Sequence, residues 1–256
     1  MGSRIARRLA GHGYDVVGWN RTPHEAGVPL AGTAREAAAH GDVVITMLAG
    51  PEALEAVTDD VLAGLRGTLV EMSTVGPAPI ARLAERTTNL VDAPVLGSIG
   101  EAESGTLTIF AGGDVAPVRT VLGQLGTVLE VGPVGSGARA KLVANAALFG
   151  VLAALGDAVA LGRTLGMNEE RLFDVLAATP LAAQAERRRA VLQGEPSPPR
   201  FPVRLAAKDA RLILEHGDFG VIEAALRALE AADADADYTA LLNEPSRAAA
   251  APRSSS

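Results

Sequence analysis

The sequence predicts an α/β domain with a mostly parallel sheet, followed by an all-helical domain. In roughly the first half of the chain, short runs rich in β-branched residues alternate with helical patterns, which is typical of βαβ units. After Gly135 the strand signals stop. The segment Gly135–Gly166 reads as one long helix, because it holds no proline after Ser136 and its apolar residues continue almost unbroken. We therefore expect domains over residues 1–134 and 135–247, and a disordered tail over 248–256.

The first domain is expected to alternate between helices and strands. Residues 2–12 form an amphipathic pattern, with Ile5 and Leu9 on one face, and Gly13 ends it. Tyr14–Trp19 is rich in β-branched and aromatic residues, as strands are. Asp42–Leu48 is almost continuously apolar, as expected of a parallel strand covered on both faces. The other predicted strands are 68–72, 89–95, 107–111 and 128–131, and the other predicted helices are 33–39, 52–65, 80–86 and 115–125.

The second domain is expected to contain helices alone. After the long helix, the predicted helices are 169–177, 181–192, 203–216 and 221–231, with a proline-rich turn at Pro196–Pro199.

Composition excludes several classes of function. The formal net charge of −7 and the lack of basic runs argue against nucleic acid as a partner. The chain has no cysteine, and its four histidines form no metal-binding pattern, so we expect no metal site. The best candidate for a membrane span is interrupted by Asp157, and the N-terminus lacks the layout of a signal peptide. The sequence therefore predicts a cytoplasmic protein with no membrane partner.

A polar turn after the predicted strand Tyr14–Trp19 suggests nucleotide binding. In dinucleotide-binding folds, an acid at this point favours the free 2′-hydroxyl of NAD, whereas an arginine accommodates the 2′-phosphate of NADP. This chain has Asn20, Arg21 and Thr22 there and no acid, so we expect NADP, with NAD possible. The plain alternative is that Arg21 is a solvated surface residue. Of the phosphate-binding pattern G-x-G-x-x-G, only the last glycine has a candidate, Gly2.

Two polar residues interrupt the apolar surface of the long helix. Lys141 and Asn145 are four residues apart, so they lie on one face. An unpaired buried charge is unfavourable, so Lys141 needs a reason to be there. Either its stem lies on the apolar surface while its ammonium reaches water, or it faces a cleft and transfers protons.

Four stretches in order resemble motifs of the β-hydroxyacid dehydrogenases, a family that includes 3-hydroxyisobutyrate dehydrogenase and glyoxylate/succinic semialdehyde reductase. The weaker matches 46–48 and 72–74 also fall in place, so the likeness covers nearly the whole chain. The four stretches are Met1–Ala6 (end of G-x-G-x-M-G-x-x-M-A), Asp92–Ser98 with Gly105–Thr108 (D-A-P-V-S-G-G…G-T-L), Gly135–Asn145 (G-x-G-x-x-x-K-x-x-N-N) and Phe201–Asp209 (F-x-x-x-L-x-x-K-D).

The resemblance implies a Rossmann-like domain and hydride transfer between a nicotinamide and a small hydroxy acid or semialdehyde. Lys141 would be the general acid and base, and Asn145 would hold substrate and lysine in register. The stretch Leu96, Gly97 and Ser98 would bind the substrate. By the same resemblance, the residues facing the cofactor would be Gly2, Asn20, Arg21, Thr22, Leu48, Ala49, Thr74 and Lys208. Lys208 has a plain alternative as a surface ion-pair partner.

The sequence departs from the family pattern at three positions. Leu96 replaces a serine that helps to bind substrate, Ser98 replaces a glycine, and Ala144 replaces the first asparagine after the lysine. Leu96 therefore indicates a more apolar pocket or a different substrate. Two alternatives stay open. One is an enzyme like the imine reductases, although these usually carry another residue in place of Lys141. The other is a non-catalytic homologue with an incomplete cofactor site.

Two further expectations concern assembly and the start of the sheet. The long helix is apolar on nearly every side, and the family joins subunits through its helical domains, so we expect a homodimer or higher homo-oligomer. Met1-Gly2 matches an internal position of the family motif. We therefore expect that the fold's first strand, which would lie between Tyr14–Trp19 and Asp42–Leu48, is missing from this chain.

Overall fold

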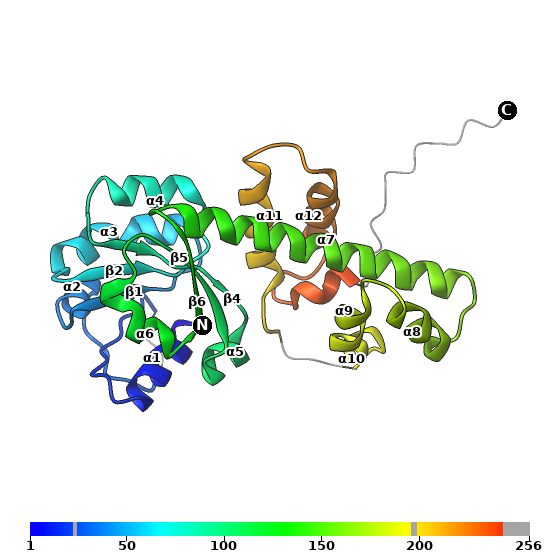
Figure 1. The fold of residues 1–256 in the computed structure, drawn as a ribbon, viewed down its shortest axis with the longest axis horizontal. Coiled ribbons are helices and arrows are strands. Elements are labelled where there is room, and N and C mark those ends of the chain that lie inside the picture. The colour runs from blue at the N-terminus through cyan, green and yellow to red at the C-terminus, as the bar shows by residue number, and fades with distance from the viewer. Residues whose placement is uncertain (23–24, 196–198, 243–256) are drawn as a thin grey trace. The chain divides into compact units, whose positions relative to one another are not determined.

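The computed structural model describes residues 1–22, 25–195 and 199–242 and consists of two compact units, Met1–Leu142 and the part from Val143 onward (Figure 1). The first unit is α/β and the second is helical, so the predicted fold class is confirmed. The predicted boundary at 134/135 falls just before the long helix, whereas the two units divide within that helix. The predicted tail 248–256 and most of the turn Pro196–Pro199 lie outside the described residues.

The first unit is built on a six-stranded sheet. The strands β1, β2 and β3 are parallel neighbours, β5 runs antiparallel to β3 and β4, and β6 is parallel to β5. The strands are β1 Val43–Thr46, β2 Thr68–Glu71, β3 Leu90–Asp92, β4 Val95–Leu96, β5 Leu107–Gly112 and β6 Gly126–Gly132.

Two apolar cores cover the two faces of this sheet. Successive side chains of a strand point to opposite faces, so Leu69 of β2 joins one core and Val70 joins the other. Helices α2 (Ala34–Ala38), α3 (Pro51–Gly64) and α4 (Pro77–Ala84) contribute to the core of Leu69. The core of Val70 is completed by α1 (Gly2–Gly11), α5 (Ile99–Ser104), η1 (Ala116–Val118) and α6 (Arg119–Gly123).

The predicted strand Tyr14–Trp19 is wrong. Among its residues only Gly18 pairs, in an isolated bridge to Leu30. The side chains still alternate, because Tyr14 and Val16 pack on one core and Trp19 packs on the other. The pattern thus matches the alternation of these side chains between the two cores but not the pairing of a strand. A strand also needs a hydrogen-bonded neighbour, and no strand of the described chain runs beside this segment.

The long helix, α7, runs from Ser136 to Thr164. It ends through Gly166, whose positive φ of 75° suits a helix C-terminus, with a bond from Met167 N–H to the Gly162 carbonyl oxygen. Among the described residues, α7 is the one helix long and apolar enough to span a membrane by length and composition, so Asp157 does not disqualify it. That is weak evidence of a span, because core helices pass the same test.

The remaining helices of the second unit are α8 Glu169–Ala177, α9 Ala182–Arg187, α10 Arg189–Leu192, α11 Val203–Leu214, α12 Gly220–Ala231 and η2 Tyr238–Leu242. The predicted helix 181–192 is in fact two helices, because Arg188 leaves the helical conformation (φ −117°, ψ 11°). In the first unit, the predicted strand 89–95 is likewise divided, at Ala93-Pro94, and the sequence did not predict α5.

Candidate active site

Three buried polar residues form a row at the carboxyl edge of the parallel strands. Thr46 ends β1 and pairs in register with Glu71, which ends β2 and pairs in turn with Asp92 at the end of β3. Thr46 is 7% exposed, and both acids are fully buried. In open α/β sheets, ligands bind outside this edge. The row therefore forms the floor of the candidate site.

Glu71 connects the loops that follow β1 and β2. Its carboxylate contacts the Thr46 hydroxyl and accepts a hydrogen bond of 2.7 Å from Ser73 N–H. The Ser73 hydroxyl oxygen then accepts a bond of 2.7 Å from Leu48 N–H. Burial raises the pKa of Glu71, and the neighbouring Asp92 adds to that rise. Glu71 thus holds together the two loops that carry Leu48, Ala49 and Thr74.

Asp92 joins the sheet to the start of α7. One carboxylate oxygen accepts a hydrogen bond of 2.8 Å from Gly135 N–H, and the other accepts one of 2.7 Å from Ala138 N–H. These amides belong to the helix start, where backbone donors lack partners within the helix. Burial raises the pKa of Asp92 to about 6, although the backbone donors favour its ionised form.

Lys141 and Asn145 follow this start on one face of α7. Both are buried, at 8% and 1% exposure. Lys141 lies one turn beyond Ala138, so its backbone is carried by the part of the helix that Asp92 holds. Lys141 is thus largely buried, and its role in proton transfer stays a prediction.

Asn145 belongs to a polar cluster within the second unit. Its side-chain amide donates a hydrogen bond of 2.7 Å to the carboxylate of Asp209, which is 2% exposed. Lys208 forms an ion pair of 2.7 Å with the same carboxylate. The structure thus joins two predicted site residues, Asn145 and Lys208, through a third residue. The ion pair is the plain alternative foreseen for Lys208, and its cofactor role stays a prediction.

The predicted substrate stretch forms the turn from β4 into α5. Leu96 is partly buried and pairs with Thr108 of β5. Gly97 has a φ of 134°, and an added Cβ would lie 2.7 Å from the Leu107 side chain, so glycine is required there. The amide and the hydroxyl of Ser98 both donate bonds of 2.9 Å to Glu101. A substrate using the Ser98 hydroxyl would therefore compete with a helix cap.

The predicted cofactor residues fall into two groups. Gly2 opens α1, and a Cβ added to it would lie 3.7 Å from the side chain of Met47, just past β1, so this helix start is close to Leu48 and Ala49. Helices α3 and α4 follow the loops after β1 and β2, and helix N-termini favour phosphate groups. The edge therefore fits a dinucleotide. The second group, Asn20, Arg21 and Thr22, is exposed, and the Asn20 amide donates to the Thr22 carbonyl oxygen at 2.6 Å.

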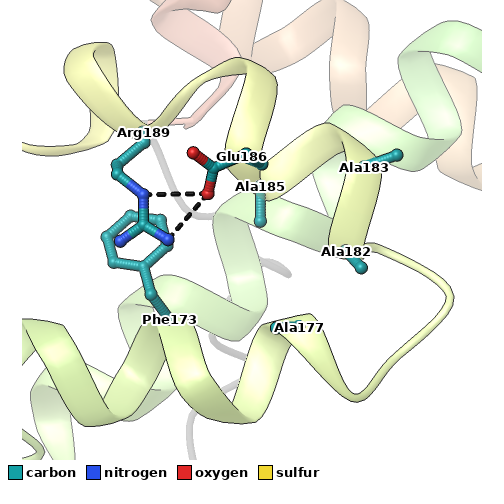
Figure 2. Close-up of a pocket in the computed structure, with 7 residues that line it drawn as sticks. All are labelled: Phe173, Ala177, Ala182, Ala183, Ala185, Glu186 and Arg189. Carbon is teal, nitrogen blue, oxygen red and sulfur yellow. Dashed lines mark hydrogen bonds and ion pairs between the residues drawn. The ribbon is translucent and has the colours of Figure 1, made fainter.

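A separate cavity of about 340 Å³ lies in the second unit (Figure 2). Arg189 covers it with its guanidinium 4.1 Å from the ring centre of Phe173, and it pairs with Glu186 at 2.7 Å. The two charges neutralise each other, and none of the predicted site residues contributes to the wall. The lining residues are Phe173, Ala177, Ala182, Ala183, Ala185, Glu186 and Arg189. The cavity is therefore separate from the candidate site. Among the described residues, no three His, Asp or Glu side chains gather as metal ligands.

The structure adds three acids to the predicted site: Glu71, Asp92 and Asp209. Asp92 is the first residue of the D-A-P-V stretch, and Asp209 directly follows Lys208 in the K-D stretch. Their role could have been suspected, because an acid inside an apolar run is expected to have a specific partner. Glu71 ends the predicted strand 68–72 and carries the same signal.

Two family models match consecutive parts of the chain. Residues 1–132 match the NAD-binding domain of 6-phosphogluconate dehydrogenase. Residues 135–244 match the NAD-binding domain of NADP-dependent 3-hydroxyisobutyrate dehydrogenase. The two matches meet just before α7.

Individual similar proteins also indicate the dehydrogenase family. A probable 3-hydroxyisobutyrate dehydrogenase of Mycobacterium tuberculosis is 34% identical over 192 residues, covering 69% of this chain and 65% of the relative. The chain thus spans slightly less than two thirds of that relative. The solved structure of a 3-hydroxyisobutyrate dehydrogenase from the same species with L-serine is 27% identical, with a TM-score of 0.83 over 94% of each chain. An imine reductase of Pseudomonas shares the fold at 22% identity, with a TM-score of 0.61 over 94% of each chain. Together with the motifs and the two-unit architecture, these matches establish that the chain belongs to the β-hydroxyacid dehydrogenase family.

Proposed function

We propose that this protein is an NADP-dependent oxidoreductase that interconverts a small hydroxy acid or alcohol and its semialdehyde, with Lys141 as general acid and base. The observation that carries the proposal is the burial of Lys141 one turn beyond a helix start tied to the ligand-binding edge of the sheet. Proton transfer needs a group that is held in place and can change its charge near neutral pH.

The use of basic residues supports this assignment. The chain has 23 basic side chains, and Lys141 and Lys208 are its two lysines, since every other one is arginine. Arginine stays protonated at any physiological pH, whereas the pKa of lysine shifts readily on burial. Lysine thus occurs at the two positions to which family resemblance assigns a role at the site.

The residues at the sheet edge would hold the cofactor. Leu48, Ala49 and Thr74 lie in the loops that Glu71 connects, Gly2 opens the adjacent helix, and Arg21 would receive the 2′-phosphate. When bound, the nicotinamide supplies the hydride transfer, which no side chain can perform.

The protein's own groups would position the substrate and move a proton. Lys141 gives a proton to the carbonyl oxygen as negative charge develops there, and takes it back in the reverse direction. Asn145, oriented by Asp209, holds the substrate in register. Backbone groups around Gly97 and Ser98 receive the substrate carboxylate. The partly buried Leu96 favours a substrate with an apolar substituent close to that carboxylate.

Assembly as a homodimer through α7 also belongs to this proposal. In the second unit, α7 exposes a stripe of apolar residues that recur at helical spacing. Val143 and Leu161 of the helix are 70% and 60% exposed, and Leu165, directly after its end, is 70% exposed, so this segment carries more apolar surface than its own unit covers. The resemblance to dehydrogenases that pair through their helical domains supports a second copy as the cover.

The test is Lys141→Met, with Arg139→Met as the matched control. Arg139 is exposed, lies two residues earlier on α7, and loses a positive charge in the same way. The substrates are 3-hydroxyisobutyrate, glyoxylate and succinic semialdehyde with both cofactors. We expect Lys141→Met to lower kcat by about 100-fold or more while NADPH binding is kept, and Arg139→Met to change kcat less than about twofold. A Lys141→Met protein with most of its kcat would exclude the assignment.

Two other functions are separated by the same assays. An imine reductase has this fold, so 1-pyrroline is added to the panel, and turnover of the imine alone would favour that activity. Lys141 argues against this alternative. A non-catalytic homologue would turn over none of the substrates, and a fluorescence titration would show no binding of NADPH.

A further inference from the structure

The carboxylate of Asp92 links two parts of the first unit that are distant in sequence. Asp92 ends β3, and both of its oxygens accept backbone N–H groups about 45 residues later, at Gly135 and Ala138. Most helix starts are capped by a side chain from the residue just before the helix. Here Gly135 holds that place and has no side chain, so the cap comes from the sheet.

Close packing against Gly112 and Gly137 restricts the Asp92 carboxylate to one position. A Cβ added to Gly112, the register partner of Asp92 on β5, would lie 2.4 Å from a carboxylate oxygen. A Cβ added to Gly137 would lie 2.4 Å from the Asp92 carbonyl oxygen and 2.9 Å from the other carboxylate oxygen. Contacts this short do not occur between real atoms, so β3, β5 and the first turn of α7 meet at their closest possible approach.

A purely structural cap would not need a charged group here. Burying a carboxylate is unfavourable, and a serine before the helix would cap it near the surface at lower cost. A carboxylate with two acceptor oxygens holds two amides at once, and hydrogen bonds to an ionised group are the stronger ones. The buried carboxylate thus fixes the helix start firmly, although burying it lowers the stability of the fold.

We propose that Asp92 is the positioning residue for Lys141: by fixing the first turn of α7 to the end of β3, it sets where the lysine ammonium lies at the site. Lys141 is three residues beyond Ala138 on a continuous helix, so a shift of that turn moves the lysine by a similar distance. The inference rests on the proposed role of Lys141, and it gives the first residue of the D-A-P-V motif a role that does not involve touching substrate.

The test replaces Asp92 by asparagine, which keeps the shape but turns one acceptor into a donor facing a backbone N–H. The matched control is Asp114→Asn, because Asp114 also caps a backbone amide of the first unit, that of Ala116 at 3.1 Å, but is exposed. Displacement of a reacting group by about 1 Å lowers rates by as much as about 100-fold. We expect Asp92→Asn to lower kcat by at least about tenfold, with KM for NADPH within about twofold, and Asp114→Asn to change neither.

A second readout follows the lysine itself without any substrate. Protein labelled with ¹³C at the lysine ε-carbon gives two side-chain signals, because the chain has two lysines, and Lys208→Arg assigns them. In Asp92→Asn, the Lys141 signal and its titration midpoint should move, while those of Lys208 stay. Asp114→Asn should leave both signals in place.

The two readouts separate the possible failures. If Lys141→Met keeps its kcat, the proposed function is wrong, but the lysine signal still reports whether Asp92 positions that side chain. An unchanged Lys141 signal in folded Asp92→Asn overturns the inference, whatever happens to kcat. Should Asp92→Asn fail to fold, the smaller Asp92→Ser, which keeps one oxygen acceptor, is measured in its place and judged by the same two criteria.

Discussion

Gly137→Ala is expected to destabilise the first unit, even though alanine is the better helix former. The added Cβ would lie 2.4 Å from two backbone oxygens, those of Asp92 and Phe110, and backbone atoms cannot turn aside as a flexible side chain does. To reach even 3.0 Å, the helix start must move by about 0.6 Å, which would stretch the bonds of 2.7 and 2.8 Å to Asp92 beyond the usual limit of about 3.2 Å.

The expected change in the free energy of unfolding combines two unfavourable contributions and one favourable contribution. Overpacking costs about 1–3 kcal/mol. Weakening two hydrogen bonds to a charged group removes part of about 1.5–3 kcal/mol for each. Alanine in place of glycine returns about 0.5–1 kcal/mol in a helix. We therefore expect a net loss of about 2–4 kcal/mol in the free energy of unfolding, within the range of known core lesions.

Urea unfolding measures this loss, followed by the fluorescence of Trp19. Trp19 is the one tryptophan of the chain and packs against a core of the first unit. The matched control is Gly123→Ala, because Gly123 is also helical, lies in the same unit and has no atom within 4 Å of an added Cβ. The control should gain up to about 1 kcal/mol. If Gly137→Ala unfolds within about 0.5 kcal/mol of the parent chain, the close approach inferred here is wrong.

The other predictions concern cofactor, pH and assembly. Arg21→Ala should weaken NADPH binding about tenfold or more and leave NADH binding nearly unchanged, because a charge-assisted bond contributes about 1.5–3 kcal/mol; equal losses in a fluorescence titration would contradict this. Burial raises the pKa of Asp92 from 3.8 to about 6, so between these values the folded state holds more protons than the unfolded state, and unfolding free energy falls as pH rises. The free energy of unfolding of the parent chain minus that of Asp92→Asn should therefore be smaller near pH 7 than near pH 4. If urea unfolding gives the same difference at both pH values, the raised pKa of Asp92 is excluded. For the dimer, Leu161→Glu should give monomers in sedimentation at micromolar concentration, whereas Val175→Glu on α8, 51% exposed, should not; a monomeric parent chain would rule the dimer out.

The sequence predicted those elements whose signal is local. The bounds of α8, Glu169–Ala177, were predicted to the residue, because Asn168 caps its start, where its side-chain oxygen accepts from Arg171 N–H. The segment Tyr14–Trp19 failed because hydrogen bonding to a neighbouring strand is not a property of the segment's own residues. The break at Arg188 could not be predicted either, since no Gly or Pro marks it. There the guanidinium contacts Gln184 and donates to the hydroxyl of Tyr238, 50 residues away.

In the candidate site, too, the local features were predicted from the sequence and the long-range contacts were not. Motif spacing predicted Lys141 and Asn145 on one helix face, because four residues make about one turn. The link from Asn145 to Lys208 through Asp209 crosses 64 residues, and the link from Asp92 to the helix start crosses 46. Pairings at such separations depend on how the chain folds back on itself, and one sequence carries no direct record of them.

The segment from Asp92 to Ser98 combines a structural role and a proposed substrate-binding role within seven residues. Asp92 anchors the helix of Lys141, and Leu96, four residues later, is the residue that the proposed function assigns to substrate selection. Asp92 and the three residues after it are buried, whereas Leu96 and Ser98 are partly exposed. Under the proposed function, a mutation at Leu96 is therefore expected to alter which molecule is accepted while the anchor stays in place. A designer seeking a new activity should randomise Leu96 and Ser98 and leave Asp92, Gly112 and Gly137 untouched.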